Sequence, residues 1–269
     1  MKIKSKVKLL NFVISISVIT LIVVIGVAWR RADAQSELER LSKERDAQMT
    51  SVHPDEVEET TVKGDLENRS FIYKENKNAQ WIAINSDFMG WLKIPGTNID
   101  YPYLRSSDNK DYLTLDIYKK YSDAGSLFMD YRNLGNFNDE HTVIYGHYMK
   151  NETMFHNLTY YHDIEYLKSH DVIEISGLYE TRTFKIFSVY EISVDDYVLD
   201  LNFETPDAYK DYIDSLTNLS MHNTYSEAYF QTLAAEASDV TELKLLTLVT
   251  CSYGVENGRT IVHAMEILN

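Results

Sequence analysis

Apolar residues fall first into one long run near the N-terminus and afterwards into many short segments. Residues 9–29 are almost wholly apolar, and only Asn11 and small hydroxyl residues interrupt them. A helix rises 1.5 Å per residue, so this run would cover roughly 30 Å, the thickness of a bilayer core. A cleaved signal peptide has a shorter apolar stretch, and the candidate cleavage site at 32–34 follows two arginines. The pattern predicts an uncleaved transmembrane helix.

Basic residues on the two sides of this run predict its orientation. The four lysines within residues 1–8 outnumber Arg30 and Arg31. Because the side richer in Lys and Arg stays inside, residues 1–8 are expected to form a cytoplasmic tail. The chain would then be a single-pass protein of the cell membrane, with everything after residue 31 outside the cell.

The segment after the apolar run lacks a large hydrophobic face. Residues 30–50 are charged and rich in helix formers, which predicts a solvated helix that continues from the membrane. Residues 51–69 are acidic and contain Pro and Gly, which is typical of a linker. Residues 30–69 are therefore expected to form an extracellular stalk, with a globular domain over 70–269 that begins near Phe71.

Short apolar segments in 70–269 are typical of β-strands. A helix is expected to start at 81 and to break at Gly90, and helical patterns return at 152–168 and 205–236. The absence of a regular alternation of strands and helices favours a mainly β, α+β domain, a barrel or sandwich with peripheral helices. The predicted strands are 91–94, 98–103, 126–131, 141–147, 171–177, 182–193, 243–250 and 260–267.

Charge excludes one class of partner. The formal net charge of the chain is −15. Residues 1–29 hold four Lys and no acidic residue, so the rest has 26 − 4 = 22 basic and 41 acidic residues, a net charge of −19. Nucleic-acid binding needs a basic surface, so no nucleic-acid partner is expected.

Cys251 is the single cysteine, so no intramolecular disulfide can form. It ends a predicted strand, and Asn257-Gly258 in the following loop is a strong turn signal. The hairpin would set Arg259 beside Cys251, where a guanidinium lowers a thiol pKa and stabilises an oxyanion. The alternatives are a buried, inert thiol and a surface arginine.

A cysteine nucleophile also needs a group that transfers protons. His147 follows Gly146 at the end of a predicted strand, where the backbone leaves room for a ligand. On pattern alone His147 is only a slightly better candidate for proton transfer than the other histidines. No carboxylate is clearly placed to orient it. The other histidines are 53, 141, 156, 162, 170, 222 and 263, of which 263 is expected within a strand.

Metal binding is the weaker hypothesis. The chain has no paired cysteines and no His-Glu-x-x-His sequence. "SSDNKD" at 106–111 lacks the remainder of a calcium-binding loop. Neither a metal nor a cofactor is expected.

Three features together resemble one family. "TLVTC" at 247–251, "YGH" at 145–147 and the following Arg259 resemble the sortases, membrane-anchored cysteine transpeptidases of Gram-positive bacteria. Class B is indicated by "NSDFMGWLKIPGTNIDYPYL", "DNKDYL", "GSLFMDYRN" and the long helical insertion near 205–236. The resemblance covers about residues 70–269.

The resemblance implies a sortase-type closed β-barrel of about eight strands. It makes Cys251 the nucleophile, His147 the general acid/base and Arg259 the group that stabilises the oxyanion. Val249 departs from the serine that the family often has at this position, which changes how the polar residues of a substrate are recognised. The residues implied to line the peptide groove are Asn109, Leu113, Tyr145, Val249 and Thr250.

The implied reaction is cleavage of a C-terminal sorting signal after Thr, through a thioester, followed by transfer to an amine. The expected partners are surface proteins that contain such a signal and, as acceptor, a peptidoglycan precursor or a pilin lysine. Two alternatives remain at this stage. One is a membrane-tethered cysteine protease that only hydrolyses, and the other is a non-enzymatic surface binding protein with a structural Cys251.

Overall fold

The computed structural model describes residues 2–51, 78–195, 199–236, 243–251 and 258–267. The chain divides into two units, Met1–His53 and Pro54–Asn269. The predicted linker over 51–69, the start of the domain near Phe71 and most of the Asn257-Gly258 turn lie outside the described residues.

The first unit contains one continuous helix, α1 (Lys2–Ser51). It spans both the predicted anchor over 9–29 and the predicted stalk helix over 30–50, so their helical state is confirmed. No helix in the described ranges meets the combined length and hydropathy that crossing a membrane requires. The transmembrane assignment of 9–29 is therefore not confirmed.

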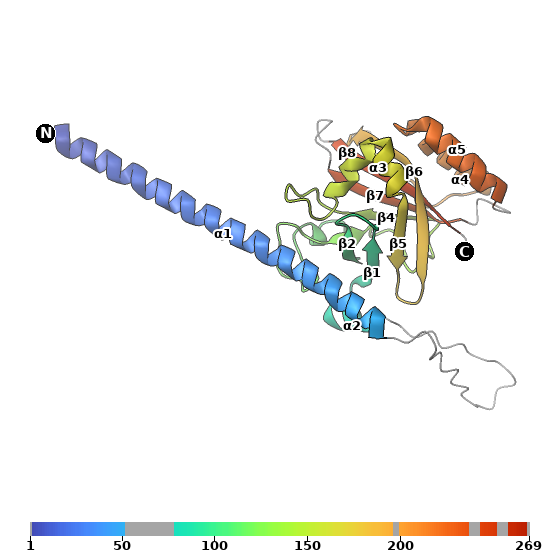
Figure 1. The fold of residues 1–269 in the computed structure, drawn as a ribbon, viewed down its shortest axis with the longest axis horizontal. Helices are drawn as coiled ribbons and strands as arrows, with labels where there is room; N and C mark the ends of the chain where they lie inside the picture. Colours follow the sequence, from blue (N-terminus) through green and yellow to red (C-terminus); the bar gives the residue numbers. More distant parts are fainter. Residues whose placement is uncertain (1, 52–77, 196–198, 237–242, 252–257, 268–269) are drawn as a thin grey trace, which may run out of the picture. The chain divides into compact units, whose positions relative to one another are not determined.

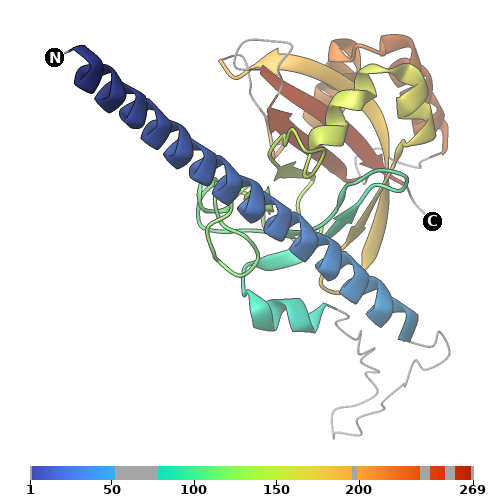
Figure 2. The same ribbon diagram turned by 60° about the vertical axis from the view of Figure 1, so that its left-hand side comes forward.

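The second unit is built on a closed barrel in the order β1-β2-β3-β4-β7-β8-β6-β5 (Figures 1 and 2). Every predicted strand is present, with shifts at the ends, which confirms the closed β-barrel with peripheral helices. The strands could be predicted from the sequence because they are short runs rich in β-branched and aromatic residues. The bounds are β1 (Phe88–Lys93), β2 (Asp100–Leu104), β3 (Leu127–Met129), β4 (His141–Tyr145), β5 (Val172–Ser176), β6 (Thr181–Ser193), β7 (Leu245–Cys251) and β8 (Gly258–Glu266).

Two of the strand pairs are parallel, β2 with β3 and β4 with β7. The other six pairs are antiparallel, and the pair of β6 and β8 is the longest. A parallel pair needs a long connection, and the one from β4 to β7 includes β5, β6 and all the later helices. This connection brings the ends of β4 and β7 to the same edge of the barrel.

Helices cover the outside of the barrel (Figure 1). The predicted helix 205–236 is divided near Ser220 into α4 (Pro206–Leu219) and α5 (Asn223–Glu236). Thr205 starts α4, because its side chain accepts a hydrogen bond from the Ala208 N–H at 3.1 Å. The predicted helix 152–168 is η2 (His156–His162) followed by α3 (Ile164–Ser169).

The face of α4 that meets the barrel is apolar. Tyr209, Ile213 and Leu216 recur at helical spacing and are buried in one cluster with Val249 of β7 and Ile261 of β8. Burying such side chains stabilises the fold by about 1.5–3 kcal/mol each. The same contacts hold the outer face of β7 against a helix, close to where β7 ends.

The break predicted at Gly90 was wrong. The helix α2 (Ala79–Ile84) already ends at Asn85, and Gly90 lies inside β1. A Cβ atom at this position would lie 2.5 Å from the Ser176 carbonyl oxygen and 2.8 Å from the Tyr103 ring. Glycine is needed here because two neighbouring segments approach the backbone closely, not because a helix stops.

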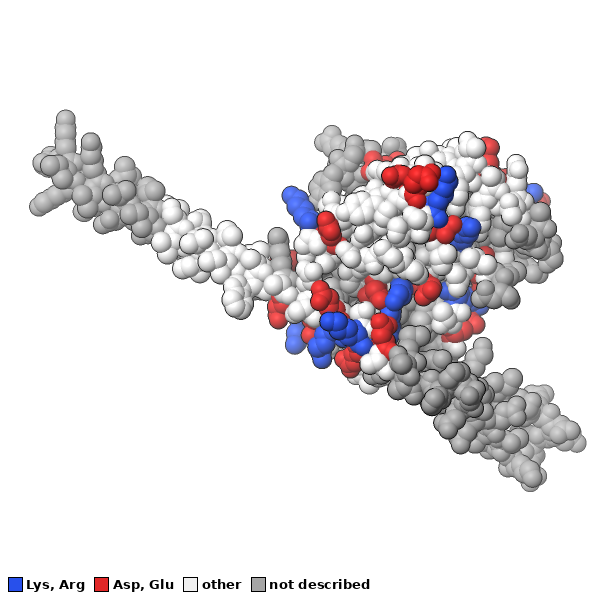
Figure 3. Space-filling view, in the orientation of Figure 1, with Lys and Arg blue, Asp and Glu red and all other residues white. Residues whose placement is uncertain are grey.

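Charged side chains of both signs lie close together on the second unit. On the face that Figure 3 shows, blue and red groups lie side by side and do not form separate areas. Together with the net charge of −15, this gives no large basic footprint on that face for a nucleic acid.

Candidate active site

Strand register aligns the three residues that the sequence singled out. In the parallel pair, Tyr145 of β4 is opposite Val249 of β7, and the N–H of Gly146 donates to the Val249 carbonyl at 3.1 Å. Two residues further along come His147, just beyond the end of β4, and Cys251, the last residue of β7. In the next pair, Cys251 is opposite Arg259 of β8. The three residues therefore lie at one edge of three adjacent strands.

Strand alternation separates the residues next to Cys251. Val249 is 2% exposed and belongs to the outer cluster with α4. Position 251 has the same parity as Val249, whereas Thr250 belongs to the opposite face of β7. Thr250 is also buried, and its hydroxyl has no hydrogen-bond partner among the residues that the structure describes. Roles for Val249 and Thr250 in peptide binding stay predictions.

A backbone carbonyl orients His147. Its Nε2 lies 2.8 Å from the carbonyl oxygen of Leu113, and His147 is partly buried. A carbonyl only accepts, so Nε2 must hold the proton in this bond. The neutral ring then has its lone pair on Nδ1. Sequence reasoning could not find this partner, because every residue has a carbonyl.

Leu113 ends a short helix, η1 (Asp111–Leu113), whose position is set by its neighbours. The hydroxyl of Tyr112 donates to Asp87 Oδ2 at 2.7 Å and accepts from Asn85 Nδ2 at 2.9 Å. Gly125 adopts φ +56°, and a Cβ there would lie 2.7 Å from the Leu113 oxygen. Glycine at 125 thus lets the chain pass directly beneath the carbonyl that holds His147.

Burial and hydrogen bonding have opposite effects on the pKa of Asp87. Burial alone raises the pKa of this carboxyl group, but hydrogen bonds from Lys119 and Tyr112 outweigh it and lower the pKa below its usual range. Lys119 also pairs with Asp87 at 2.8 Å. An ionised Asp87 therefore fastens η1 to the start of β1 at neutral pH.

Arg259 is partly buried, and its guanidinium donates to the Gly258 carbonyl at 3.0 Å. Within the described part of the chain it forms no ion pair with a carboxylate. Its charge is thus not neutralised by a described neighbour. A guanidinium in this position has donors to offer to an anion at the Cys251 end of the strands.

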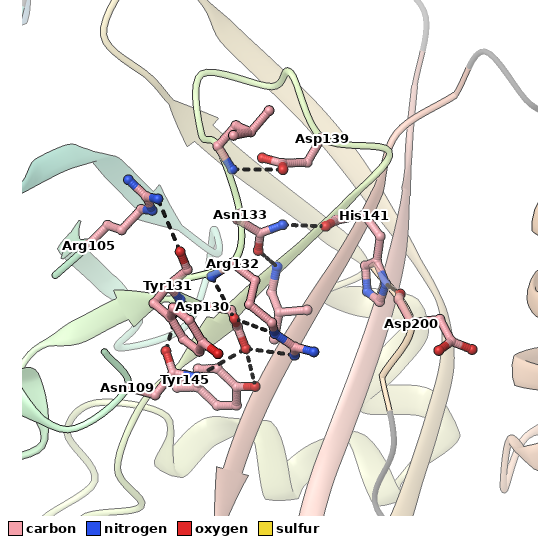
Figure 4. A network of polar contacts seen from close by, with 12 residues as sticks. Arg105, Asn109, Asp130, Tyr131, Arg132, Asn133, Asp139, His141, Tyr145 and Asp200 are labelled. Atoms are coloured by element: carbon pink, nitrogen blue, oxygen red, sulfur yellow. Dashed lines mark hydrogen bonds and ion pairs between the residues drawn. The ribbon is translucent and has the colours of Figure 1, made fainter. Parts of the chain in front are cut away.

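Two of the predicted groove residues meet at a residue that the sequence did not suggest. The side chains of Asn109 and Tyr145 both hydrogen-bond to Asp130, which follows β3 (Figure 4). Leu113, the third predicted groove residue, is 37% exposed and contributes the carbonyl described above. The structure therefore brings Asn109 and Leu113 together with Tyr145 and His147, from two segments about 30 residues apart in the sequence.

Among the described residues, no group of three or more His, Cys, Asp and Glu side chains is arranged to hold a metal ion.

Comparison with known proteins identifies the family. The Sortase domain model matches residues 92–267. Sortase B of Listeria monocytogenes is 34% identical over 181 residues, which is 66% of this chain and 69% of that protein. Sortase B of Staphylococcus aureus is 32% identical over 187 residues, which is 68% of this chain and 72% of that protein.

Solved structures agree with this. A sortase B–substrate complex of Staphylococcus aureus has a TM-score of 0.70 at 25% identity, over 87% of this chain and 96% of that chain. Sortase B of Clostridium perfringens has a TM-score of 0.63 at 29% identity, over 71% of this chain and all of the other.

The barrel, with Cys251, His147 and Arg259 at one edge, together with these relatives, defines an enzyme of the cysteine transpeptidase class. The chain belongs to the sortase family, and its relatives place it in class B.

Proposed function

We propose that this chain cleaves a C-terminal sorting signal after threonine and joins the released end to an amine. The main support is the register: Tyr145, two residues before His147, pairs with Val249, two residues before Cys251, and Cys251 pairs with Arg259. Acyl transfer needs a nucleophile, a proton carrier and a group that stabilises the oxyanion, and these residue types provide all three. Membership of the sortase family supports the anchoring of surface proteins in general.

In the first half-reaction, the Cys251 thiol passes its proton to His147, and the resulting thiolate attacks the backbone carbonyl carbon of the threonine. The Arg259 guanidinium stabilises the negative oxygen of the tetrahedral intermediate. As the C–N bond breaks, His147 gives a proton to the departing amine, and a thioester remains. Because Nε2–H of His147 is bonded to the Leu113 carbonyl, we assign this proton transfer to Nδ1.

In the second half-reaction, an amine attacks the thioester carbonyl carbon. His147 takes up the proton of the amine, the C–S bond breaks, and the Cys251 thiolate is regenerated. The acceptor in this proposal is the amine of a peptidoglycan precursor or of a pilin lysine. The product is a surface protein with a new amide bond at its threonine.

A fluorogenic sorting-signal peptide tests the proposal on the full chain. Cleavage is expected to vanish in Cys251→Ala and to fall by at least about a thousandfold in His147→Ala. His162→Ala is the matched control, because His162 is 39% exposed and pairs with Glu191, at 3.3 Å, which is not one of the candidate site residues. Full cleavage by Cys251→Ala would exclude the enzyme and leave the non-enzymatic binding protein.

The role of Arg259 has its own test. Arg259→Lys keeps the charge but loses the planar fork of five donors, so kcat should fall by about 10²–10³. Arg40→Lys, an exposed arginine of α1 paired with Glu37, serves as the control. If Arg259→Lys turned over the peptide as fast as the unmodified enzyme, Arg259 would have only a structural role in the hairpin and would not stabilise the oxyanion.

Transfer is separated from hydrolysis by the product. With a glycine-based amine present, mass spectrometry is expected to detect the peptide joined to that amine. If only the free carboxylic acid forms at every amine concentration, the enzyme is a protease and not a transpeptidase.

Membrane anchorage by residues 9–29, with the second unit outside the cell, is part of the proposal and rests on the sequence pattern. The full chain should remain in the membrane pellet after alkaline carbonate extraction. A variant that lacks residues 1–29 should become extractable. External protease should digest the second unit in intact protoplasts, and complete protection there would contradict the orientation.

A further inference from the structure

Asp130 is a buried carboxylate without a role in the reaction described above. It follows β3 directly, and its side chain is 0% exposed. Its N–H donates to the Val143 carbonyl of β4 at 2.9 Å, so its backbone is fixed as well. A buried charge is costly unless it is paired and hydrogen-bonded, which makes the identity of its partners informative.

Five hydrogen bonds converge on this carboxylate (Figure 4). Oδ1 accepts from the backbone N–H and from Nε of Arg132, at 3.0 and 2.9 Å. Oδ2 accepts from a terminal nitrogen of Arg132 at 3.0 Å, from Asn109 Nδ2 at 3.1 Å and from the Tyr145 hydroxyl at 2.9 Å. The donors come from three segments: the approach to η1, the end of β4 and the loop after β3.

Two of these segments contain His147 and the carbonyl group to which it hydrogen-bonds. Asn109 lies four residues before Leu113, whose carbonyl holds His147. Tyr145 lies two residues before His147 on β4. One carboxylate therefore joins the chain that bears the acceptor for His147 to the strand end that bears His147 itself.

The carboxylate also determines which atoms the groove presents. The N–H of Tyr131 donates to Asn109 Oδ1 at 2.9 Å, so the amide nitrogen of Asn109 must face Asp130. The Tyr145 hydroxyl must donate, because an ionised carboxylate only accepts. The two bonds together fix the orientation of the Asn109 amide.

Asp130 is ionised at neutral pH. Burial by itself raises the pKa of its carboxyl group, but the hydrogen bonds from Arg132, Tyr145 and Asn109 outweigh burial and lower the pKa. Arg132 supplies the compensating charge, and its own side chain is 45% exposed. Asp130 thus keeps its negative charge inside the fold at neutral pH, balanced by Arg132.

We propose that Asp130 is a positioning residue, whose carboxylate holds Asn109 and Tyr145 in the geometry that the peptide groove and His147 require. It touches no reacting atom, and it acts through these two side chains. The inference rests on the proposed transpeptidase function.

Asp130→Asn is the main test, since it keeps the size of the side chain and removes the charge. We expect kcat/KM for the sorting-signal peptide to fall by about 10- to 100-fold, because small misplacements of positioning groups cost this much. Asp139→Asn is the matched control. Asp139 lies in the same loop and is 7% exposed, and its hydrogen bonds to described residues are from the backbone N–H groups of Leu134 and Gly135, at 2.8 Å each. It should lower stability without changing KM.

A double-mutant cycle separates positioning from general stability. In a background of Asn109→Ala with Tyr145→Phe, adding Asp130→Asn should cost less than threefold in kcat/KM, because the side chains through which it acts are gone. A full, additive loss in that background would overturn the proposal. If Asp130→Asn does not fold, Tyr145→Phe alone remains decisive, since an unchanged kcat and KM would contradict the inference.

One measurement needs no peptide substrate. Cys251 is the sole cysteine, so iodoacetamide alkylation as a function of pH reports its thiol pKa directly. Asp130→Asn should displace His147, so the pH midpoint of Cys251 alkylation should move upward toward the pKa of a free thiol. Asp139→Asn should leave this midpoint unchanged. An unchanged midpoint refutes the positioning of His147, whether or not the chain proves to be a transpeptidase.

Discussion

Thr247 lies at the centre of a buried hydrogen-bond chain that crosses four strands. The hydroxyl is 2.6 Å from His141 Nε2 and 2.6 Å from His263 Nδ1. His141 Nδ1 is 2.5 Å from the Asp200 carbonyl oxygen, and His263 Nε2 is 3.0 Å from the Tyr190 hydroxyl. Thr247 and both histidines are 0% exposed.

One arrangement of protons satisfies this chain with both rings neutral. The Asp200 carbonyl only accepts, so His141 donates from Nδ1 and its Nε2 accepts from the Thr247 hydroxyl. Thr247 then accepts from Nδ1–H of His263, whose Nε2 accepts from Tyr190. Removing the Thr247 hydroxyl would leave one acceptor and one donor without partners in the core.

Thr247→Val keeps the shape of the side chain and removes that hydroxyl. Each unsatisfied buried group costs about 1–3 kcal/mol, so the loss is about 2–6 kcal/mol before a gain of about 1 kcal/mol from the added methyl group. For a domain of this size, 1 kcal/mol shifts Tm by about 2–4 °C. The net loss of about 1–5 kcal/mol should therefore lower Tm by about 2–20 °C.

Thermal unfolding of the full chain, followed by circular dichroism, measures the effect. Thr260→Val is the matched control, because Thr260 is also 0% exposed but its hydroxyl has no hydrogen-bond partner among the described residues. That variant should be neutral or slightly more stable. If both variants lose the same stability, the hydrogen-bond chain contributes nothing beyond ordinary packing, and the reasoning fails.

Three other predictions follow from burial and close contact. Burial lowers the pKa of His141 to about 4, although the hydrogen bond to a carbonyl opposes this. The unfolded chain then binds the extra proton between about pH 6.5 and 4, so stability should fall by up to about 1.4 kcal/mol per pH unit as the pH drops through this window. Urea midpoints at pH 7 and pH 5 check this, and equal midpoints would contradict it. Gly146→Ala should destabilise the fold by about 1–3 kcal/mol and lower activity, because its Cβ would overlap the Leu127 side chain and lie 2.6 Å from the Phe155 ring. An unchanged Tm would show that both side chains move aside at no cost. Gly125→Ala should cost more activity than stability, since φ is +56° and backbone oxygens of η1 lie beneath it, and a normal kcat would argue against η1 as the support of His147.

The barrel strands could be predicted because their signal is local. Alternation and composition within five to ten residues are enough to mark a strand, and all eight predicted strands exist. The pairing of Cys251 with Arg259 was accessible for the same reason, since a hairpin joins neighbouring strands. Gly90 misled the prediction, because a glycine needed for close backbone approach looks like a helix stop in the sequence.

Only the tertiary structure decided the contacts between segments that are distant in the sequence. Nothing in the pattern around His147 shows that β4 pairs in parallel with β7, so its proximity to Cys251 depended on family resemblance until the register was known. The Leu113 carbonyl that orients His147 has no sequence signature, because every residue offers one. Asp130 was missed for a related reason: a carboxylate in a loop looks exposed until remote donors are seen to bury and satisfy it. Local chemistry thus determined the strands and the reactive residue types, whereas long-range packing decided which groups hold those residues in place.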